Sequence, residues 1–131
     1  ENVTTQNGLS SHYVRCIAQD KYGLMWFGTD EGLNRYDGSQ FDVFRHTRSA
    51  DSGLNSSWIN CIYEDSEGNL WIGTEKGISV FDIENGTFVD GKENYLNHLN
   101  PNSLEAITNC FVAHKIIFKN TASSFKKRSQ T

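Results

Sequence analysis

Two stretches of the chain repeat one pattern, and this pattern decides the fold. Residues 23–38 read GLMWFGTDEGLNRYDG, and residues 68–83 read GNLWIGTEKGISVFDI. Extending outward, residues 8–37 align with residues 53–82 without a gap, and twelve of the thirty positions are identical. A repeat period of 45 residues indicates an architecture built from repeated units.

Each copy divides into four short segments of β character. In the first copy these segments read YVRCIAQD, LMWFGT, LNRYD and FDVFRH, and in the second WINCIYED, NLWIGT, ISVFD and TFVDG. The segments between them are rich in Asp and Gly, which favour tight turns, and Asn85-Gly86 is a strong hairpin signal. Four short antiparallel strands per unit are typical of one β-propeller blade.

The sequence therefore predicts an all-β fold made of β-propeller blades of four antiparallel strands. We expect one complete blade at 8–50, a second at 53–95 and a partial third at 103–118, since EAITNCFVAHK is similar to SWINCIYED. After His114 the repeat pattern stops. The remaining basic tail, 119–131, is expected to be disordered.

The residues that recur have structural explanations. Tryptophan fills space between neighbouring sheets, glycine inside a strand allows close approach, and aspartate accepts N–H bonds in a turn. Because every blade needs these functions, recurrence predicts scaffold and not a site. The repeat motif comprises Asp20, Gly23, Trp26, Gly28, Thr29 and Gly32, and their partners Asp65, Gly68, Trp71, Gly73, Thr74 and Gly77.

The stretches VRCIAQDKYGLMWFGTDEGLNRYD and INCIYEDSEGNLWIGTEKGISVFD resemble the two-component regulator propeller repeat. The resemblance covers residues 8 to about 90. It implies the periplasmic sensor propeller of a hybrid two-component system of gut Bacteroides-type bacteria, which senses breakdown products of complex polysaccharides. The chain is then expected to be a fragment of such a regulator.

Composition and spacing favour no enzyme class. The net charge is −4 and all sixteen acidic residues lie at or before Glu105, so the body is not suited to bind nucleic acid. No run of 18 apolar residues predicts a membrane segment in this chain. The three cysteines follow the repeat period without a C-x-x-C pair, and no motif indicates a metal, a cofactor or a catalytic group.

Two functional classes remain. In a ligand-sensing propeller, an oligosaccharide would contact loop residues that differ between the copies. The candidates are His12, Tyr13 and Trp58, just before the first strands, and Asn34 and Arg35, which have no like-for-like match in Ser79 and Val80. Ordinary packing or a solvated loop is the alternative for each. The second class is a scaffold module that uses its blades for protein contacts.

Ring closure requires further partners. Propellers contain four to eight blades, more than this chain supplies. The missing blades are expected to come from the rest of a longer protein, or from other copies of this chain in a homo-oligomeric ring with a head-to-tail interface.

Overall fold

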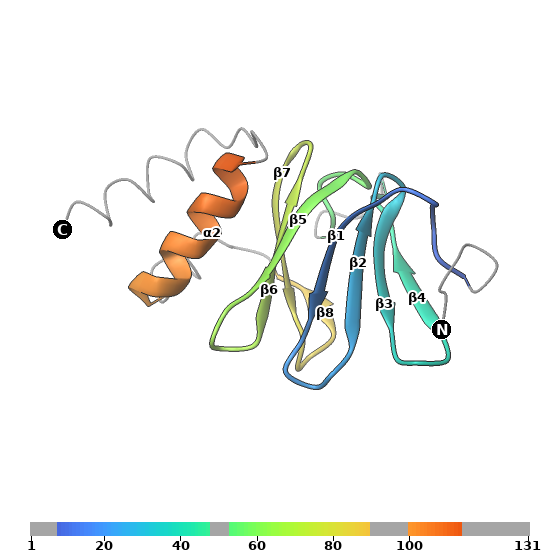
Figure 1. Ribbon diagram of the computed structural model, residues 1–131, viewed down its shortest axis with the longest axis horizontal. Coiled ribbons are helices and arrows are strands. Elements are labelled where there is room, and N and C mark those ends of the chain that lie inside the picture. Colours follow the sequence, from blue (N-terminus) through green and yellow to red (C-terminus); the bar gives the residue numbers. More distant parts are fainter. Residues whose placement is uncertain (1–7, 48–52, 90–99, 114–131) are drawn as a thin grey trace.

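The computed structural model describes residues 8–47, 53–89 and 100–113. They form two four-stranded antiparallel sheets and one helix (Figure 1). Blade 1 has the strand order β1-β2-β3-β4 and blade 2 the order β5-β6-β7-β8. The strand bounds are β1 Val14–Gln19, β2 Met25–Thr29, β3 Gly32–Tyr36, β4 Phe41–Phe44, β5 Ile59–Glu64, β6 Asn69–Thr74, β7 Gly77–Asp82 and β8 Thr87–Phe88.

The two blades share one register as well as one topology. Val14 pairs with Thr29 and Cys16 with Gly28, and in blade 2 Ile59 pairs with Thr74 and Cys61 with Gly73. Both first strands therefore carry an irregularity at the same repeat position, between the paired residues. The expected all-β fold of four-stranded blades is confirmed for the two repeats.

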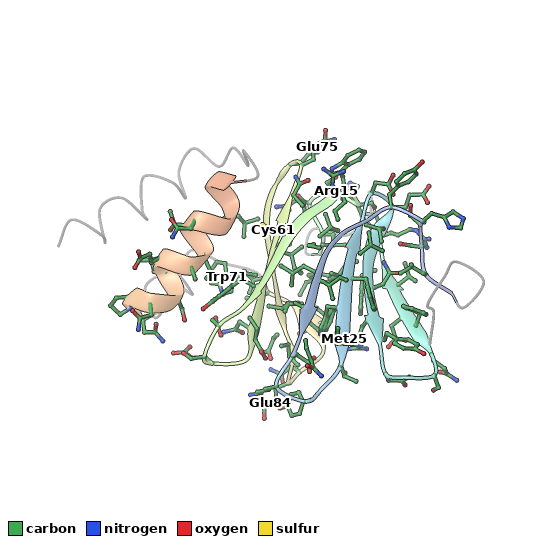
Figure 2. All side chains as sticks on the ribbon, viewed as in Figure 1. Arg15, Met25, Cys61, Trp71, Glu75 and Glu84 are labelled. Atoms are coloured by element: carbon green, nitrogen blue, oxygen red, sulfur yellow. The ribbon has the colours of Figure 1, made fainter. Side chains whose placement is uncertain are left out.

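The antiparallel strands give the molecule two ends. Arg15 and Glu75 lie at the end that we call the mouth end, where β1 and β5 begin, and Met25 and Glu84 lie at the opposite end (Figure 2). The first strands β1 and β5 are also neighbours of each other across the two sheets. Residues at the start of both blades therefore come together at the mouth end.

A buried hydrogen bond ties the first turn of each blade to its tryptophan. Trp26 donates its indole N–H to Asp20 Oδ2 at 2.8 Å, and Trp71 donates to Asp65 Oδ2 at the same distance. The other oxygen of each carboxylate accepts two backbone N–H groups in the turn, as expected for an aspartate in that position. The expected scaffold function of these recurring residues agrees with these contacts.

The turn between β3 and β4 contains a third aspartate with backbone partners. Asp37 Oδ1 accepts the N–H groups of Gln40 and Ser39, at 2.7 and 2.8 Å. These bonds stabilise the charged carboxylate, so they lower the pKa of Asp37, with Gln40 contributing most.

A second recurring contact joins the segment before each blade to its third strand. Ser10 donates its backbone N–H to Asn34 Oδ1 at 3.0 Å, and the Asn34 amide donates to Ser10 Oγ at 2.8 Å. In blade 2 the residue types are exchanged, because Asn55 donates its backbone N–H to Ser79 Oγ at 3.0 Å. The repeat thus preserves the contact while the two side chains swap places.

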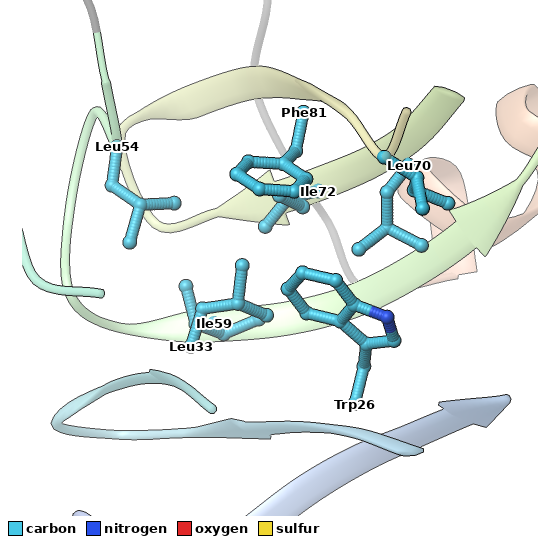
Figure 3. Packing of buried hydrophobic residues seen from close by; sticks show 8 residues of the cluster. Trp26, Leu33, Leu54, Ile59, Leu70, Ile72 and Phe81 are labelled. Atoms are coloured by element: carbon cyan, nitrogen blue, oxygen red, sulfur yellow. The ribbon is translucent and has the colours of Figure 1, made fainter. Parts of the chain in front are cut away.

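The main core lies between the blades. Trp26 and Leu33 of blade 1 pack against Ile59, Leu70, Ile72 and Phe81 of blade 2, all nearly or fully buried (Figure 3). We call the side of a blade that carries its tryptophan the Trp face, and the opposite side its back face. Gly28 lies on the Trp face, where an added Cβ would overlap Cys16 Sγ and Ile59 Cγ2. Its missing side chain lets the blades approach closely.

Blade 2 covers the Trp face of blade 1, but no described residues cover the back face of blade 1 in the same way. On blade 2 the back-face residues Ile59, Leu70 and Ile72 are fully buried. Their repeat counterparts in blade 1 are Val14, Met25 and Phe27, which are partly or largely exposed, and Ile17 on the same face is 58% exposed.

The expected partial third blade at 103–118 is wrong over its described part. Residues Pro101–Ala113 form helix α2, not a strand. Asn100 caps this helix, since its side-chain oxygen accepts the N–H of Ser103 at 2.8 Å, and Pro101 occupies the first helical position. A helix bonds its backbone N–H and C=O groups internally and therefore needs no neighbouring strand. The expected tail at 119–131 lies outside the described residues.

Replacing Asp65 with Ala tests the buried bond. The change leaves the Trp71 indole N–H without its acceptor in a buried place, so we expect a loss of unfolding free energy of about 3 kcal/mol. Urea denaturation followed by tryptophan fluorescence measures it. The matched control is Glu67→Ala, because this exposed residue lies in the same turn and its loss should change little. Equal stability of the two variants would contradict the assignment.

The exchanged pair predicts a rescue. Asn34→Ser alone leaves Ser10 without its amide partner, so we expect a loss of about 1–3 kcal/mol in unfolding free energy. Ser10→Asn added to Asn34→Ser copies the arrangement of blade 2 and should recover more than half of that loss. A double-mutant cycle in urea measures the coupling, and simple additivity of the two changes would speak against it.

Candidate functional site

Each blade presents an aromatic side chain at the mouth end, at the same repeat position. Tyr13 precedes β1 and is 72% exposed, while Trp58 precedes β5 and is 37% exposed. Both are held by the same local bond, since the backbone N–H of each donates at 3.1 Å to a serine hydroxyl two residues earlier, Ser11 or Ser56. This bond holds the backbone at the same position in both blades, so that each blade carries an aromatic side chain just before its first strand.

Two polar side chains meet beside these aromatics. Arg15 and Asn60 occupy the irregular position of β1 and β5, where a β-bulge directs a side chain away from the regular ladder. Arg15 Nε donates to Asn60 Oδ1 at 3.3 Å, and Trp58 Nε1 donates to the same oxygen at 3.1 Å. The Arg15 guanidinium also lies over the Trp58 ring, 4.6 Å from its centre. We call Tyr13, Arg15, Trp58 and Asn60 the mouth cluster.

The mouth cluster combines the groups that bind a polar, ring-shaped ligand. Its aromatic rings offer apolar faces, and the exposed Arg15 guanidinium offers hydrogen-bond donors. The buried Asn60 side chain positions Arg15 and Trp58 through its Oδ1. His12, the remaining candidate before β1, is exposed next to Tyr13. Of the five residues proposed from the sequence, the structure thus places His12, Tyr13 and Trp58 at one end of the molecule.

Asn34 belongs to the interior instead. Its side chain is fully buried and bonded to Ser10 and to the backbone oxygens of Phe27 and Gly32. A side chain without solvent contact does not meet a ligand at the surface. The expectation of a ligand contact at Asn34 is therefore corrected, and the difference from Ser79 is explained by the exchanged pair.

Arg35 also packs within the scaffold. It forms an ion pair with Asp42 at 2.8 Å, and its guanidinium lies 5.5 Å from the ring centre of Trp26 and 5.9 Å from that of Phe81. These contacts span the interface between the blades. Arg35 stabilises the packing of blade 2 on blade 1, which corrects its expected place in a binding loop.

Arg15 and Asn60 were not among the candidates taken from the sequence. The signal that could have found them is present, because both stand at one repeat position and differ in type. What the sequence does not display is the bulge at this position of each first strand, nor the closeness of β1 and β5.

Other parts of the described structure offer less chemistry. A hollow of about 330 Å³ lies between the outer strands of the two blades, lined by Val43, Phe44, Arg45, Thr47, Gly53, Leu54 and Phe88. Within residues 8–47, 53–89 and 100–113, no group of three His, Cys, Asp or Glu side chains is placed to hold a metal ion. Helix α2, the helix that the structure describes, is too short to cross a membrane.

Comparison with known proteins agrees with this geometry. A model of the two component regulator propeller matches residues 8–31 and 53–76, one match in each blade. A protein described as histidine kinase P4 from Formosa agariphila is 44% identical over 46 residues, which is 35% of this chain and 3% of that protein.

Two crystal structures from B. thetaiotaomicron are also similar. The extracellular domain of the hybrid two component system BT3049 has 32% identity and a TM-score of 0.63, over 68% of this chain and 13% of that one. The extracellular domain of the one component system BT4673 has 34% identity and a TM-score of 0.51, over 60% of this chain and 11% of that one. The chain thus spans a small part of each relative's length. Each of its two blades carries a match to the two component regulator propeller family.

Proposed function

We propose that this chain is part of the extracytoplasmic ligand-sensing propeller of a hybrid two-component regulator, and that the mouth cluster contacts a carbohydrate. The observation that carries the proposal is the pair of exposed aromatics at one repeat position, Tyr13 and Trp58, with Arg15 and Asn60 between the blades. The family and the extracellular neighbours support a sensor outside the cytoplasm, and a bacterial periplasm is the compartment that we propose.

The physical argument for a sugar is one of matching surfaces. A sugar ring presents C–H groups on its faces and hydroxyl groups around its edge. Tyr13 offers an open ring face to the first, while the exposed Arg15 offers guanidinium donors to the second. Asn60, which is 9% exposed, holds Arg15 in place. Recognition without turnover is the function that fits a sensor.

Trp58 provides a direct readout of binding. All three tryptophans of the chain lie in the described residues, and Trp26 and Trp71 are fully buried. Iodide in solution should therefore quench Trp58 and leave the other two, and Trp58→Phe should abolish this quenching. We would titrate the chain with a panel of neutral and uronic acid-containing oligosaccharides. A binding sugar should shift the Trp58 emission and reduce its quenching by iodide.

The variants locate the contact. Tyr13→Ala should weaken binding of that sugar about tenfold, which corresponds to about 1.4 kcal/mol. Tyr22→Ala is the matched control, because Tyr22 is also an exposed tyrosine, 57% accessible, but lies in the turn at the opposite end. Equal losses in the two variants would reject the mouth cluster. If no sugar alters Trp58, the alternative of a scaffold module that binds only protein gains support.

A further inference from the structure

Helix α2 covers the Trp face of blade 2, whereas the Trp face of blade 1 is covered by another blade. Leu104 and Ile107 are buried against the Trp face of blade 2, in a cluster with Trp71, Cys61 and Val80. Figure 1 shows α2 beside the second sheet, on the side away from the first, and Figure 2 shows Trp71 on that side. The equivalent Trp face of blade 1 is covered by the back face of blade 2.

The two covers differ in kind. Blade 2 presents Ile59, Leu70, Ile72 and Phe81 to the Trp face of blade 1, all nearly or fully buried. Over the residues of α2 whose side chains are described, Leu104 and Ile107 supply the buried apolar contact. One further bond holds the start of the helix, from the Asn100 amide to Ser66 Oγ at 2.9 Å, in an exposed place. The described part of α2 thus covers Trp71 with side chains of a helix, whereas blade 2 covers Trp26 with side chains of a sheet.

The back face of blade 1 would fit on the Trp face of blade 2 in place of α2. The back face of blade 1 includes Val14, Ile17, Met25, Phe27 and Tyr36, the repeat counterparts of back-face residues in the cluster of Trp26. Phe41 belongs to the same face, since it pairs with Tyr36 as Phe88 pairs with Phe81. Ile17 is 58% exposed and Val14 is 38% exposed, so this apolar face is available to a partner. A second copy of the chain presents it in the register that the first two blades already use.

We propose that α2 is an exchangeable cap on a blade-docking surface, and that its release lets the Trp face of blade 2 in one copy receive the back face of blade 1 in another. The contact is head-to-tail, because it joins two different surfaces. Attached to blade 2 by the chain, α2 competes at a high effective concentration, which keeps this chain monomeric. This inference does not depend on the ligand at the mouth cluster.

Four variants test the exchange by light scattering on a size-exclusion column over a range of protein concentrations. Ile107→Asp releases the cap, and Ile17→Asp places a charge on the back face of blade 1. The wild-type chain and Ile17→Asp should remain at the monomer mass of 14.8 kDa, while Ile107→Asp should form multiples of it as concentration rises. Asn109→Asp is the matched control, because it adds the same charge on the exposed side of α2 and should stay monomeric.

The double variant Ile17→Asp/Ile107→Asp separates docking from misfolding. It has a free Trp face but a blocked back face, so alone it should be monomeric. Mixed with the wild-type chain, which offers an open back face, it should form a one-to-one dimer. Circular dichroism and the buried emission of Trp26 verify that each variant is folded.

Three results would overturn the proposal. The first is a monomeric Ile107→Asp at every concentration, and the second is association of Ile107→Asp that Ile17→Asp does not block. The third is a wild-type dimer that Ile17→Asp alone removes, since two back faces would then pair with each other and α2 would have no part.

Discussion

The burial of one tryptophan face per blade is the constraint on which the rest of this structure depends. A buried aromatic side chain removes about 150–250 Å² from water, which corresponds to about 4–6 kcal/mol at ~25 cal/mol per Å². That is a large part of the ~5–15 kcal/mol by which a native domain is stable. Trp26 and Trp71 are both fully buried, and each keeps its indole N–H bonded to an aspartate of the first turn. A blade with its Trp face open to water would lose most of this stabilisation.

The need for a cover explains the arrangement of the whole molecule. Blade 2 covers Trp26, and helix α2 covers Trp71, so both tryptophans are buried although the described residues form two blades. The cover runs in one direction along the chain, which leaves the back face of blade 1 exposed. The same packing brings β1 and β5 together and thereby aligns the two bulges. The mouth cluster is thus a consequence of how the Trp faces are buried.

A residue that differs between the two repeats does not indicate a binding site when a second difference, elsewhere in the same blade, restores the same internal contact. Asn34 differs from Ser79, yet Ser10 and Asn55 differ in the opposite sense, and both pairs make the same internal bond. Arg15 and Asn60 also differ, but these two side chains bond to each other across the blades at the mouth end. The first difference preserves the interior of each blade, while the second creates a surface that neither blade has alone.

The sequence by itself determined the two blades, their eight strands and their turns, since β periodicity and glycine and aspartate turn signals act over a few residues. It also indicated the aromatic pair Tyr13 and Trp58 as candidates. The tertiary structure alone decided the rest. Residues 105–115 resemble a first strand in sequence, but the described residues Pro101–Ala113 form a helix, which is capped by Asn100 and packs through Leu104 and Ile107. The contact of Arg15 with Asn60 and Trp58 likewise exists only after the blades pack, because residues separated by a repeat length are joined by no local pattern.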